Sequence, residues 1–384
     1  MNTTEILFSL IRSELCGAPV NADVTESINE EMLMHLYQLS DAHDIAHIVA
    51  SALSKVKVLG SDEASEKFNK KLLLSVYRYE QINYEIIRIC KALEGAKIQF
   101  VPLKGAVIRR YYPEPWMRTS CDIDILVRET DIETVVCILK GELGYTSDDK
   151  RHYHDISLHS ETGVHLELHF SIKENNEVID RVLERVWENV VPVDDKKCHH
   201  ALTKEYFLFY IVAHIAHHFL DGGCGIRPIL DVWLMRRNMD ADESLLEEML
   251  SEARLTEFFK EVKELSDAWL SSGKHSDITK EMEDFILNAG VYGTLENRVG
   301  IAKVGKKGFQ YALQRIFMPY SKLKLTYPIL GKYPVLYPYY QLVRWKRILF
   351  KNSGKAISEL KYNASINDDK VLKFEEICKK LELL

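Results

Sequence analysis

The pattern of apolar and polar residues changes along the chain and predicts a short strand-rich unit between two helical regions. Residues 70–93 place apolar side chains at three- and four-residue spacing, which is the period of an amphipathic helix. Residues 164–170 instead alternate apolar and polar side chains, as a strand with one buried face does. The pattern predicts an α+β fold with a helical region at 1–95, a small mixed β-sheet core at 96–195, and a larger helical region at 196–384.

The middle region carries the predicted sheet. A short apolar strand ends in a Lys104-Gly105 turn, which leads into a helix-like segment. A second apolar strand is expected at 122–127, followed by a helix over 131–143. Further strands are expected near 154–158 and 164–170.

Two carboxylates share one face of the strand at 122–127, because strand side chains alternate between faces. Asp122 and Asp124 therefore point the same way, and Glu167 can join them if the two strands are neighbours. Carboxylates held this close repel each other, and a divalent cation removes the repulsion. A three-carboxylate cluster suits two metal ions and an in-line displacement at phosphorus. The predicted cofactor is Mg²⁺, or Mn²⁺ in its place.

Three residues near these carboxylates are candidates for holding a triphosphate. Lys104 supplies positive charge, and Gly105 lets the backbone approach a ligand closely. Arg118 has a planar guanidinium that matches phosphate oxygens. We interpret Arg109 and Arg110 as solvated helix residues.

Taken together, these motifs resemble a known family. Their order is similar to that of the uncharacterised nucleotidyltransferase family within the DNA polymerase beta-like nucleotidyltransferase superfamily. The resemblance extends over most of the chain from about residue 75 onward. The motifs that carry it are L-K-G at Leu103, Y-Y-P at Tyr111, Arg118, D-I-D-I-L-V at Asp122, G-Y at Gly144, H-L-E-L-H-F at His165, H-x-x-H at His214, G-I-R at Gly225, Asp231, F-M-P-Y-S-K-L at Phe317 and Y-P-I-L at Tyr327.

The resemblance implies a nucleotidyltransferase whose donor is a nucleoside triphosphate such as ATP. It makes Asp122 and Asp124 metal ligands and Glu167 the third catalytic carboxylate. The turn departs from the wider superfamily, which usually has Gly-Ser or Gly-Gly where this chain has Lys104-Gly105. Transfer of a nucleoside monophosphate with release of pyrophosphate is implied. The hydroxyl-bearing acceptor stays open between a small molecule, a peptide or protein, and an RNA end.

A histidine-rich segment allows a different interpretation. His214, His217 and His218 are close on one predicted helix, and with Asp231 they could form the zinc or iron site of a metal-dependent phosphohydrolase. We favour histidines that hydrogen-bond to a neighbouring helix. Arg227 and Asp231 are four residues apart and are expected to form an ion pair. These side chains are also candidates for lining the cleft.

Two further interpretations remain at this stage. His165 and His169 flank Glu167, and we interpret them as supporting polar groups rather than metal ligands. A non-catalytic nucleotide-binding protein, or a partner-regulated module of the same fold, is the alternative from another functional class. The presence of all three carboxylates favours catalysis.

Charge is unevenly distributed along the chain. Residues 297–358 contain thirteen Lys and Arg and no Asp or Glu, although the whole chain has a formal net charge of −7. Tyrosines and a tryptophan are interleaved with these cations, as in surfaces that bind nucleic acid, anionic lipid or a triphosphate. The alternative is that the aromatic side chains are buried between helices. We expect an anionic partner here, with leading contacts at Lys306, Lys307, Arg344, Lys346 and Arg347.

Composition agrees with a cytoplasmic protein. The chain of 384 residues is 46% hydrophobic, which is enough for more than one packed unit. Seven cysteines form no C-x-x-C pair, so reduced thiols are expected. The N-terminus lacks the basic start of a signal peptide. The best apolar run, 206–219, is interrupted by histidines, so no transmembrane segment is predicted.

Overall fold

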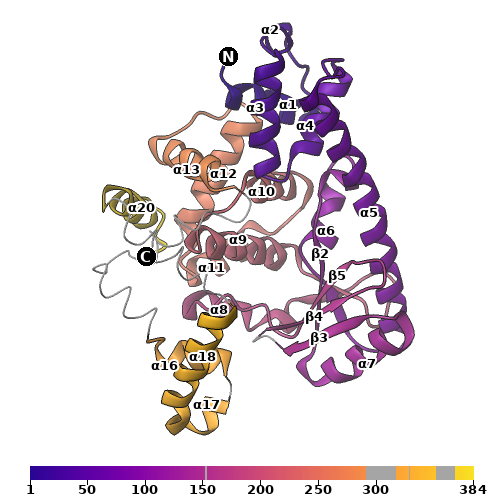
Figure 1. The fold of residues 1–384 in the computed structure, drawn as a ribbon, viewed down its shortest axis with the longest axis vertical. Coiled ribbons are helices and arrows are strands. Elements are labelled where there is room, and N and C mark those ends of the chain that lie inside the picture. Colours follow the sequence, from indigo (N-terminus) through magenta and orange to yellow (C-terminus); the bar gives the residue numbers. More distant parts are fainter. Residues whose placement is uncertain (152–153, 291–316, 328, 352–367) are drawn as a thin grey trace.

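The computed structural model describes residues 1–151, 154–290, 317–327, 329–351 and 368–384. It has the expected α+β fold, in which a small mixed sheet lies between helical regions (Figure 1). The N-terminal region is entirely helical, as predicted. Its helices are α1 (Thr3–Cys16), α2 (Ala22–Glu26), α3 (Glu30–Ala42), α4 (Ala46–Lys55) and α5 (Glu63–Gly95).

The middle of the chain holds the sheet and its connections. Its elements are β1 (Phe100–Pro102), α6 (Gly105–Ile108), η1 (Arg109–Tyr111), η2 (Pro115–Met117), β2 (Asp122–Val127), η3 (Glu129–Asp131), α7 (Ile132–Leu143), β3 (Thr146–Arg151), β4 (Asp155–His159) and β5 (His165–His169).

Helices dominate the remainder. Its elements are α8 (Glu177–Leu183), η4 (Val186–Glu188), β6 (Val190–Pro192), β7 (His200–Leu202), α9 (Lys204–Leu220), α10 (Ile226–Asn238), α11 (Glu243–Glu252), α12 (Thr256–Leu270), α13 (Asp277–Ala289), α16 (Tyr320–Thr326), α17 (Ile329–Lys332), η5 (Pro334–Leu336), α18 (Tyr337–Lys351) and α20 (Asp368–Lys380).

The five-stranded sheet has the order β1-β2-β5-β4-β3. Only the β2–β5 pair among these neighbours is parallel, and the other pairs are antiparallel. The register sets Asp122 opposite His165 and Asp124 opposite Glu167. The strands that carry the three carboxylates are therefore direct neighbours.

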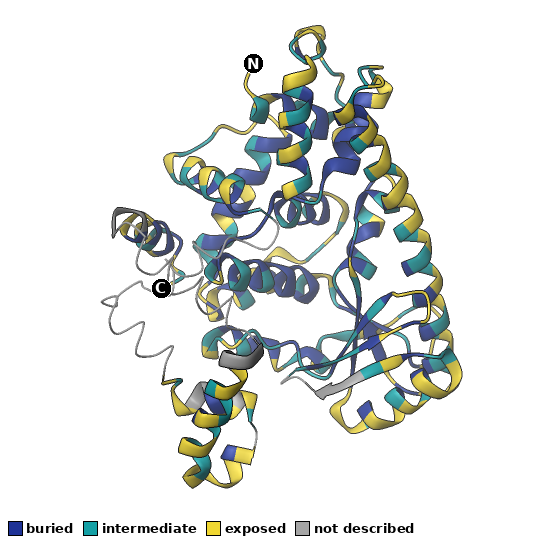
Figure 2. Cartoon of the chain, viewed as in Figure 1, coloured by how far each residue is buried: buried dark blue, intermediate teal, exposed yellow. Residues whose placement is uncertain are grey.

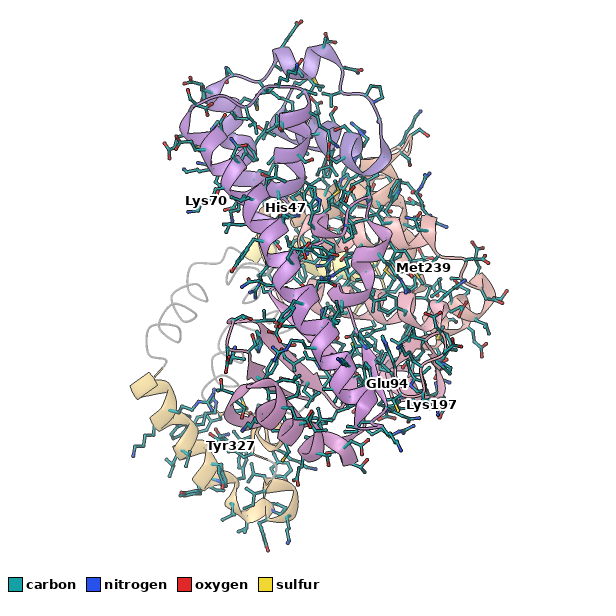
Figure 3. All side chains as sticks on the ribbon, turned by 90° about the vertical axis from the view of Figure 1, so that its right-hand side faces the viewer. His47, Lys70, Glu94, Lys197, Met239 and Tyr327 are labelled. Carbon is teal, nitrogen blue, oxygen red and sulfur yellow. The ribbon has the colours of Figure 1, made fainter. Side chains whose placement is uncertain are left out.

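Helix α5 joins the two hydrophobic clusters that the described residues form. It is 33 residues long and begins where the side chain of Asp62 accepts a hydrogen bond from the backbone of Ser65. Its first turns bury Phe68 in the helical cluster, and its last turns bury Ile89 and Leu93 against the sheet. Figure 3 shows this helix crossing the molecule between the labelled Lys70 and Glu94. One rigid element thus connects the helices with the sheet.

The two faces of the sheet join different clusters. Ile123 and Ile125 pack with residues of α5 and α7, whereas Leu126 joins the helical cluster on the other side. That helical cluster contains residues from both ends of the chain, and the Phe8 ring stacks on Trp269 with 4.6 Å between centroids. The N-terminal and C-terminal helical regions therefore share a core. The region limits at 95 and 195 stay predictions.

Three other expectations can be compared with the structure. None of the seven cysteines, which all lie within the described residues, forms a disulfide. Within the described residues, every helix is too short or too polar to cross a bilayer. The basic segment at 297–358 is described only at 317–327 and 329–351, so Lys306 and Lys307 lie outside the described residues.

Candidate metal and nucleotide site

The three predicted carboxylates lie together on one face of the sheet. Ligand atoms of Asp122, His165 and Glu167 are within 4.8 Å of one another, and the same holds for Asp124, Glu167 and His169. These are the groups of three or more possible metal ligands that the described part of the chain contains. Both arise from the parallel register, which aligns alternate residues of β2 and β5.

Asp124 is buried and held by two cationic side chains. Nζ of Lys104 lies 2.8 Å from Oδ1 of Asp124, and Nε2 of His169 lies 2.9 Å from the same oxygen. His169 Nε2 also lies 3.4 Å from Oε2 of Glu167. The imidazole thus connects the carboxylates of neighbouring strands. Sequence reasoning treated His169 only as a supporting group, and the structure brings it into the cluster.

The carboxylates differ in electrostatic environment. Burial and the negative charges of Asp124 and Glu167 raise the pKa of Asp122. Burial acts the same way on Asp124, but Lys104 and His169 outweigh it and hold the Asp124 pKa well below its usual range. The hydrogen bond from His169 lowers the pKa of Glu167. Burial opposes protonation of His169, yet its bonds to both carboxylates raise its pKa to about 9.

These residues fit a hard divalent cation. Asp122 and Glu167 offer carboxylate oxygens and His165 an imidazole nitrogen within mutual reach. Burial and repulsion from the neighbouring carboxylates raise the pKa of Asp122, and a cation between the carboxylates would offset both effects. Asp122, Asp124 and Glu167 are therefore the residues that would hold metal, with His165 and His169 beside them.

The Lys104-Gly105 turn has a conformation that explains both residues. Lys104 has φ 42° and ψ −119°, in the region that favours glycine, so its backbone is strained. Gly105 is buried, and a Cβ there would lie 3.0 Å from Cβ of Ser120. The absent side chain of Gly105 makes room for Ser120. The strained backbone of Lys104 places its side chain so that the ammonium contacts Asp124.

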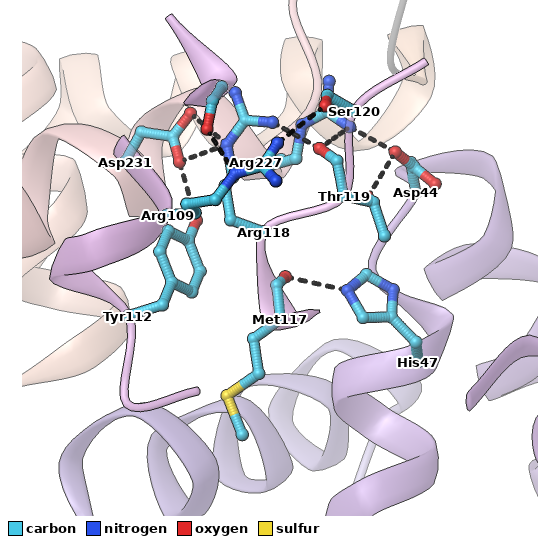
Figure 4. A network of polar contacts seen from close by, with 11 residues as sticks. Asp44, His47, Arg109, Tyr112, Met117, Arg118, Thr119, Ser120, Arg227 and Asp231 are labelled. Atoms are coloured by element: carbon cyan, nitrogen blue, oxygen red, sulfur yellow. Dashed lines mark hydrogen bonds and ion pairs between the residues drawn. The ribbon is translucent and has the colours of Figure 1, made fainter. Parts of the chain in front are cut away.

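Arg118 is held inside a buried polar network beside this turn (Figure 4). Its Nε donates to Oδ1 and Oδ2 of Asp231 at 2.8 and 3.0 Å. The Tyr112 hydroxyl donates to Oδ1 of Asp231 at 2.7 Å. Burial opposes the charge of Arg118, but Asp231 outweighs it and raises the Arg118 pKa. Asp231 thereby fixes the chain just before β2, and the proposed phosphate contact of Arg118 stays a prediction.

The expected ion pair between Arg227 and Asp231 is wrong. Arg227 instead pairs with Asp44, whose carboxylate also accepts a hydrogen bond from the Thr119 hydroxyl at 2.9 Å. Asp231 lies on α10, as Arg227 does, but its carboxylate pairs with Arg118. Four-residue spacing made a pair possible, but both side chains reach across to the loop before β2. Figure 4 shows these contacts on opposite sides of that loop.

Arg109 is not a solvated helix residue as expected. It is buried, its Nε donates to the Gly105 carbonyl at 2.8 Å, and its Nη2 donates to the Ser120 hydroxyl at 3.1 Å. Burial and the nearby Arg118 charge lower its pKa to about 10. Arg109 thus braces the turn against the loop before β2. Arg110 is exposed, as expected.

A comparison with models of known protein families shows to which family the chain belongs. A family model described as an uncharacterised nucleotidyltransferase matches residues 29–271. The chain belongs to this nucleotidyltransferase family. No curated protein and no solved structure matches it. Family membership supports general nucleotidyl transfer, and the matched range contains Lys104, Arg118 and the three carboxylates.

In this nucleotidyltransferase, the histidine-rich helix α9 has its own acidic partner. Nδ1 of His214 lies 2.7 Å from Oε1 of Glu174, and Nε2 of His218 lies 3.1 Å from Nε2 of His214. Burial opposes ionisation of Glu174, but His214 lowers its pKa to about 2. Burial and the charge of Lys104 lower the pKa of His214. The charge of Lys104 therefore reaches α9, so this helix lies near the site.

The structure does not join these histidines with Asp231. Asp231 is engaged by Arg118 and Tyr112, and neither group of possible metal ligands in the described residues includes His214 or His217. Glu174 was missed by sequence reasoning. It follows β5 in an irregular segment without periodicity, so its meeting with α9 depends on tertiary structure.

Proposed function

We propose that this protein transfers a nucleoside monophosphate from a nucleoside triphosphate to a hydroxyl-bearing acceptor with the help of Mg²⁺ or Mn²⁺. The supporting observation is the parallel pairing of β2 with β5, which gathers Asp122, Asp124 and Glu167 on one face. Family membership supports the class of reaction. The carboxylate arrangement supports metal dependence, because hard cations bridge carboxylates and phosphates.

The reaction forms one bond to the α-phosphorus and breaks another. The acceptor oxygen attacks the α-phosphorus, the bond to the oxygen that leads to the β-phosphate breaks, and pyrophosphate leaves. Glu167, whose pKa is lowered by His169, is ionised at neutral pH and accepts the acceptor proton. Bound metal would supply Lewis acidity at the phosphate oxygens. Asp122 and Asp124 would bind that metal.

Lys104, Gly105 and Arg118 orient the triphosphate in this proposal. Burial disfavours the charge of Lys104, but Asp124 outweighs it and raises the Lys104 pKa, so the ammonium stays charged. Nη1 of Arg118 lies 3.8 Å from the position that a Cβ atom would occupy at Gly105. Two cations thus flank the turn, where they can offset phosphate charge. We place the reaction in the cytoplasm, where thiols such as those of this chain stay reduced.

A labelling screen tests this function. The protein is incubated with each of the four nucleoside triphosphates labelled at the α-phosphate, with Mg²⁺ or Mn²⁺ and a cell extract. The proposal predicts metal-dependent label in a small-molecule, protein or RNA fraction. Nucleotide binding with no label in any fraction would support the non-catalytic alternative. A requirement for zinc or iron and release of free phosphate would support the phosphohydrolase.

A further inference from the structure

The segment from α16 to α18 is a compact basic hairpin. Between Phe317 and Lys351 the sequence has seven lysines and arginines and no acidic residue. Of these cations, Lys324, Lys332, Lys346 and Arg347 are exposed. Figure 1 shows the hairpin at one end of the molecule, beyond α8. The exposed charged side chains that the structure describes in this hairpin are therefore all positive, in a protein whose net charge is negative.

The hairpin also exposes large apolar side chains. Val335 is 83% exposed, Tyr339 59% and Leu342 58%. Tyr339, Leu342 and Lys346 follow at three- and four-residue spacing on α18, so they share one face of that helix. Ile329 is exposed as well. Figure 2 shows exposed positions over much of this hairpin. One face of α18 thus carries both apolar and cationic groups.

These exposed residues are not the core of the hairpin. The hairpin is closed by other contacts: the Tyr320 hydroxyl donates to the Leu330 carbonyl, and the Tyr337 hydroxyl donates to the Met318 carbonyl, both at 2.6 Å. The Trp345 ring packs edge-on against Phe317 with 5.3 Å between centroids. The alternative that the aromatic side chains are buried between helices does not hold for the described residues, because Tyr337 and Trp345 are half-buried and Phe317 is 52% exposed.

We propose that this basic hairpin docks on the surface of an anionic phospholipid bilayer. Charge complementarity selects an anionic partner, since the hairpin sequence contains seven lysines and arginines and no carboxylate. The aliphatic side chains select lipid rather than nucleic acid, because Val335 and Leu342 offer no ring on which bases stack. Tyrosine suits the interface between headgroups and acyl chains, and lysines extend toward headgroups from apolar surroundings.

The geometry fits docking in the plane of the membrane. Pro334 and Pro338 interrupt the segment, so it presents short helices rather than one long amphipathic helix. The exposed Val335 lies in η5 between them. Shallow insertion of this turn and of one face of α18 would leave the site on the sheet outside the bilayer. The proposal concerns location at a membrane and does not depend on the transfer reaction.

Vesicle sedimentation with the full-length protein tests the proposal. The vesicles are phosphatidylcholine alone, or phosphatidylcholine with phosphatidylglycerol. We expect binding only to the anionic vesicles and a steep loss with added salt. A charge variant, Lys332→Gln/Lys346→Gln/Arg347→Gln, should bind about a hundredfold more weakly, since each basic residue near an anionic surface contributes about fivefold. An apolar variant, Val335→Ser/Leu342→Ser, should lose about tenfold or more for each side chain.

Matched controls separate docking from general surface effects. Leu73→Ser/Leu245→Ser removes two exposed leucines from α5 and α11 and should leave vesicle binding unchanged. The variant Lys196→Gln/Lys274→Gln/Lys280→Gln removes three exposed positive charges outside the hairpin and should also leave vesicle binding unchanged. Thermal melts confirm that every variant folds. Brominated acyl chains should quench tryptophan fluorescence, and Trp345→Phe should remove that quenching.

Three outcomes would overturn the proposal. The first is that the wild-type protein does not bind anionic vesicles at low salt. The second is that the control variants lose as much vesicle binding as the hairpin variants. The third is that the protein binds RNA, that the apolar variant binds RNA equally well, and that vesicles do not compete with RNA.

Discussion

Nζ of Lys104 lies 2.8 Å from Oδ1 of Asp124, so a partly buried ion pair joins the turn before α6 to the strand that carries Asp122 and Asp124. Asp122 lies two residues away on the same face, yet burial and its carboxylate neighbours raise its pKa. The two aspartates thus contribute to stability with opposite sign. Asp124 stabilises the metal-free fold, whereas the charge of Asp122 destabilises it.

Substitution of the two aspartates should separate activity from stability. Asp122→Asn and Asp124→Asn should both abolish transfer. Asp122→Asn should raise the free energy of unfolding by up to about 1 kcal/mol without metal, because it removes a charge that burial and the neighbouring carboxylates disfavour. Asp124→Asn should lower it by about 3 kcal/mol, because Lys104 and His169 lose their buried partner. Urea unfolding with and without Mg²⁺ measures both effects. Full activity in either variant would contradict metal binding at these residues.

Glu167→Gln should reduce the chemical step far more than nucleotide affinity. Loss of the proton acceptor should lower the rate by about two to four orders of magnitude. Single-turnover rates and nucleotide titrations separate the two quantities. Glu161→Gln, an exposed position in the connection between β4 and β5, is the matched control and should change neither. Parallel losses of rate and affinity in Glu167→Gln would instead assign this residue a structural role.

Lys104 can be tested by separating its charge from its backbone conformation. Lys104→Met keeps the strained backbone and removes the ammonium, whereas Lys104→Gly removes both the ammonium and the strain. Both variants should lose transfer activity. The glycine variant should be more stable than the methionine variant by about 1 kcal/mol, since the freedom of glycine in the unfolded chain offsets part of the relief. Equal unfolding free energies would show that the backbone at 104 is not strained.

The loss of folding stability at low pH should depend on Glu174. Its pKa falls from 4.5 to about 2 on folding, so ionised Glu174 stabilises the fold above about pH 4.5. That contribution is lost as the pH falls toward 2. Glu174→Gln should remove it and flatten the dependence of unfolding free energy on pH between these values. Glu184→Gln, which affects a half-exposed ion pair with Lys173, should change little. A pH dependence that survives in Glu174→Gln would contradict the assignment.

The sequence predicts those features that depend on local periodicity. Alternation over 164–170 places Glu167 on the face opposite Leu166 and Leu168, and the same rule pairs Asp122 with Asp124. The helical regions follow from a period near 3.6 residues. Strand β3, with the sequence TSDDKR, has no such pattern and forms because it pairs with β4.

Long-range polar contacts could not be predicted. Arg227 meets Asp44 and Arg118 meets Asp231 because helices distant in sequence pack around the same loop. Spacing within α10 favoured a local pair that tertiary structure replaces. Burial of Arg109 likewise depends on how closely the Gly105 turn approaches Ser120. Charge partners of this kind are decided by packing and not by sequence neighbours.

The fate of each phosphate tests the central claim most directly. The nucleotide identified by the labelling screen is supplied in two forms, labelled at the α-phosphate or at the γ-phosphate, with Mg²⁺ and the acceptor fraction. The account predicts that α-label enters the acceptor, that γ-label leaves as pyrophosphate, and that Asp122→Asn prevents both. Transfer of γ-label to the acceptor, or its release as free phosphate while α-label stays in the nucleotide, would contradict nucleotidyl transfer at this site.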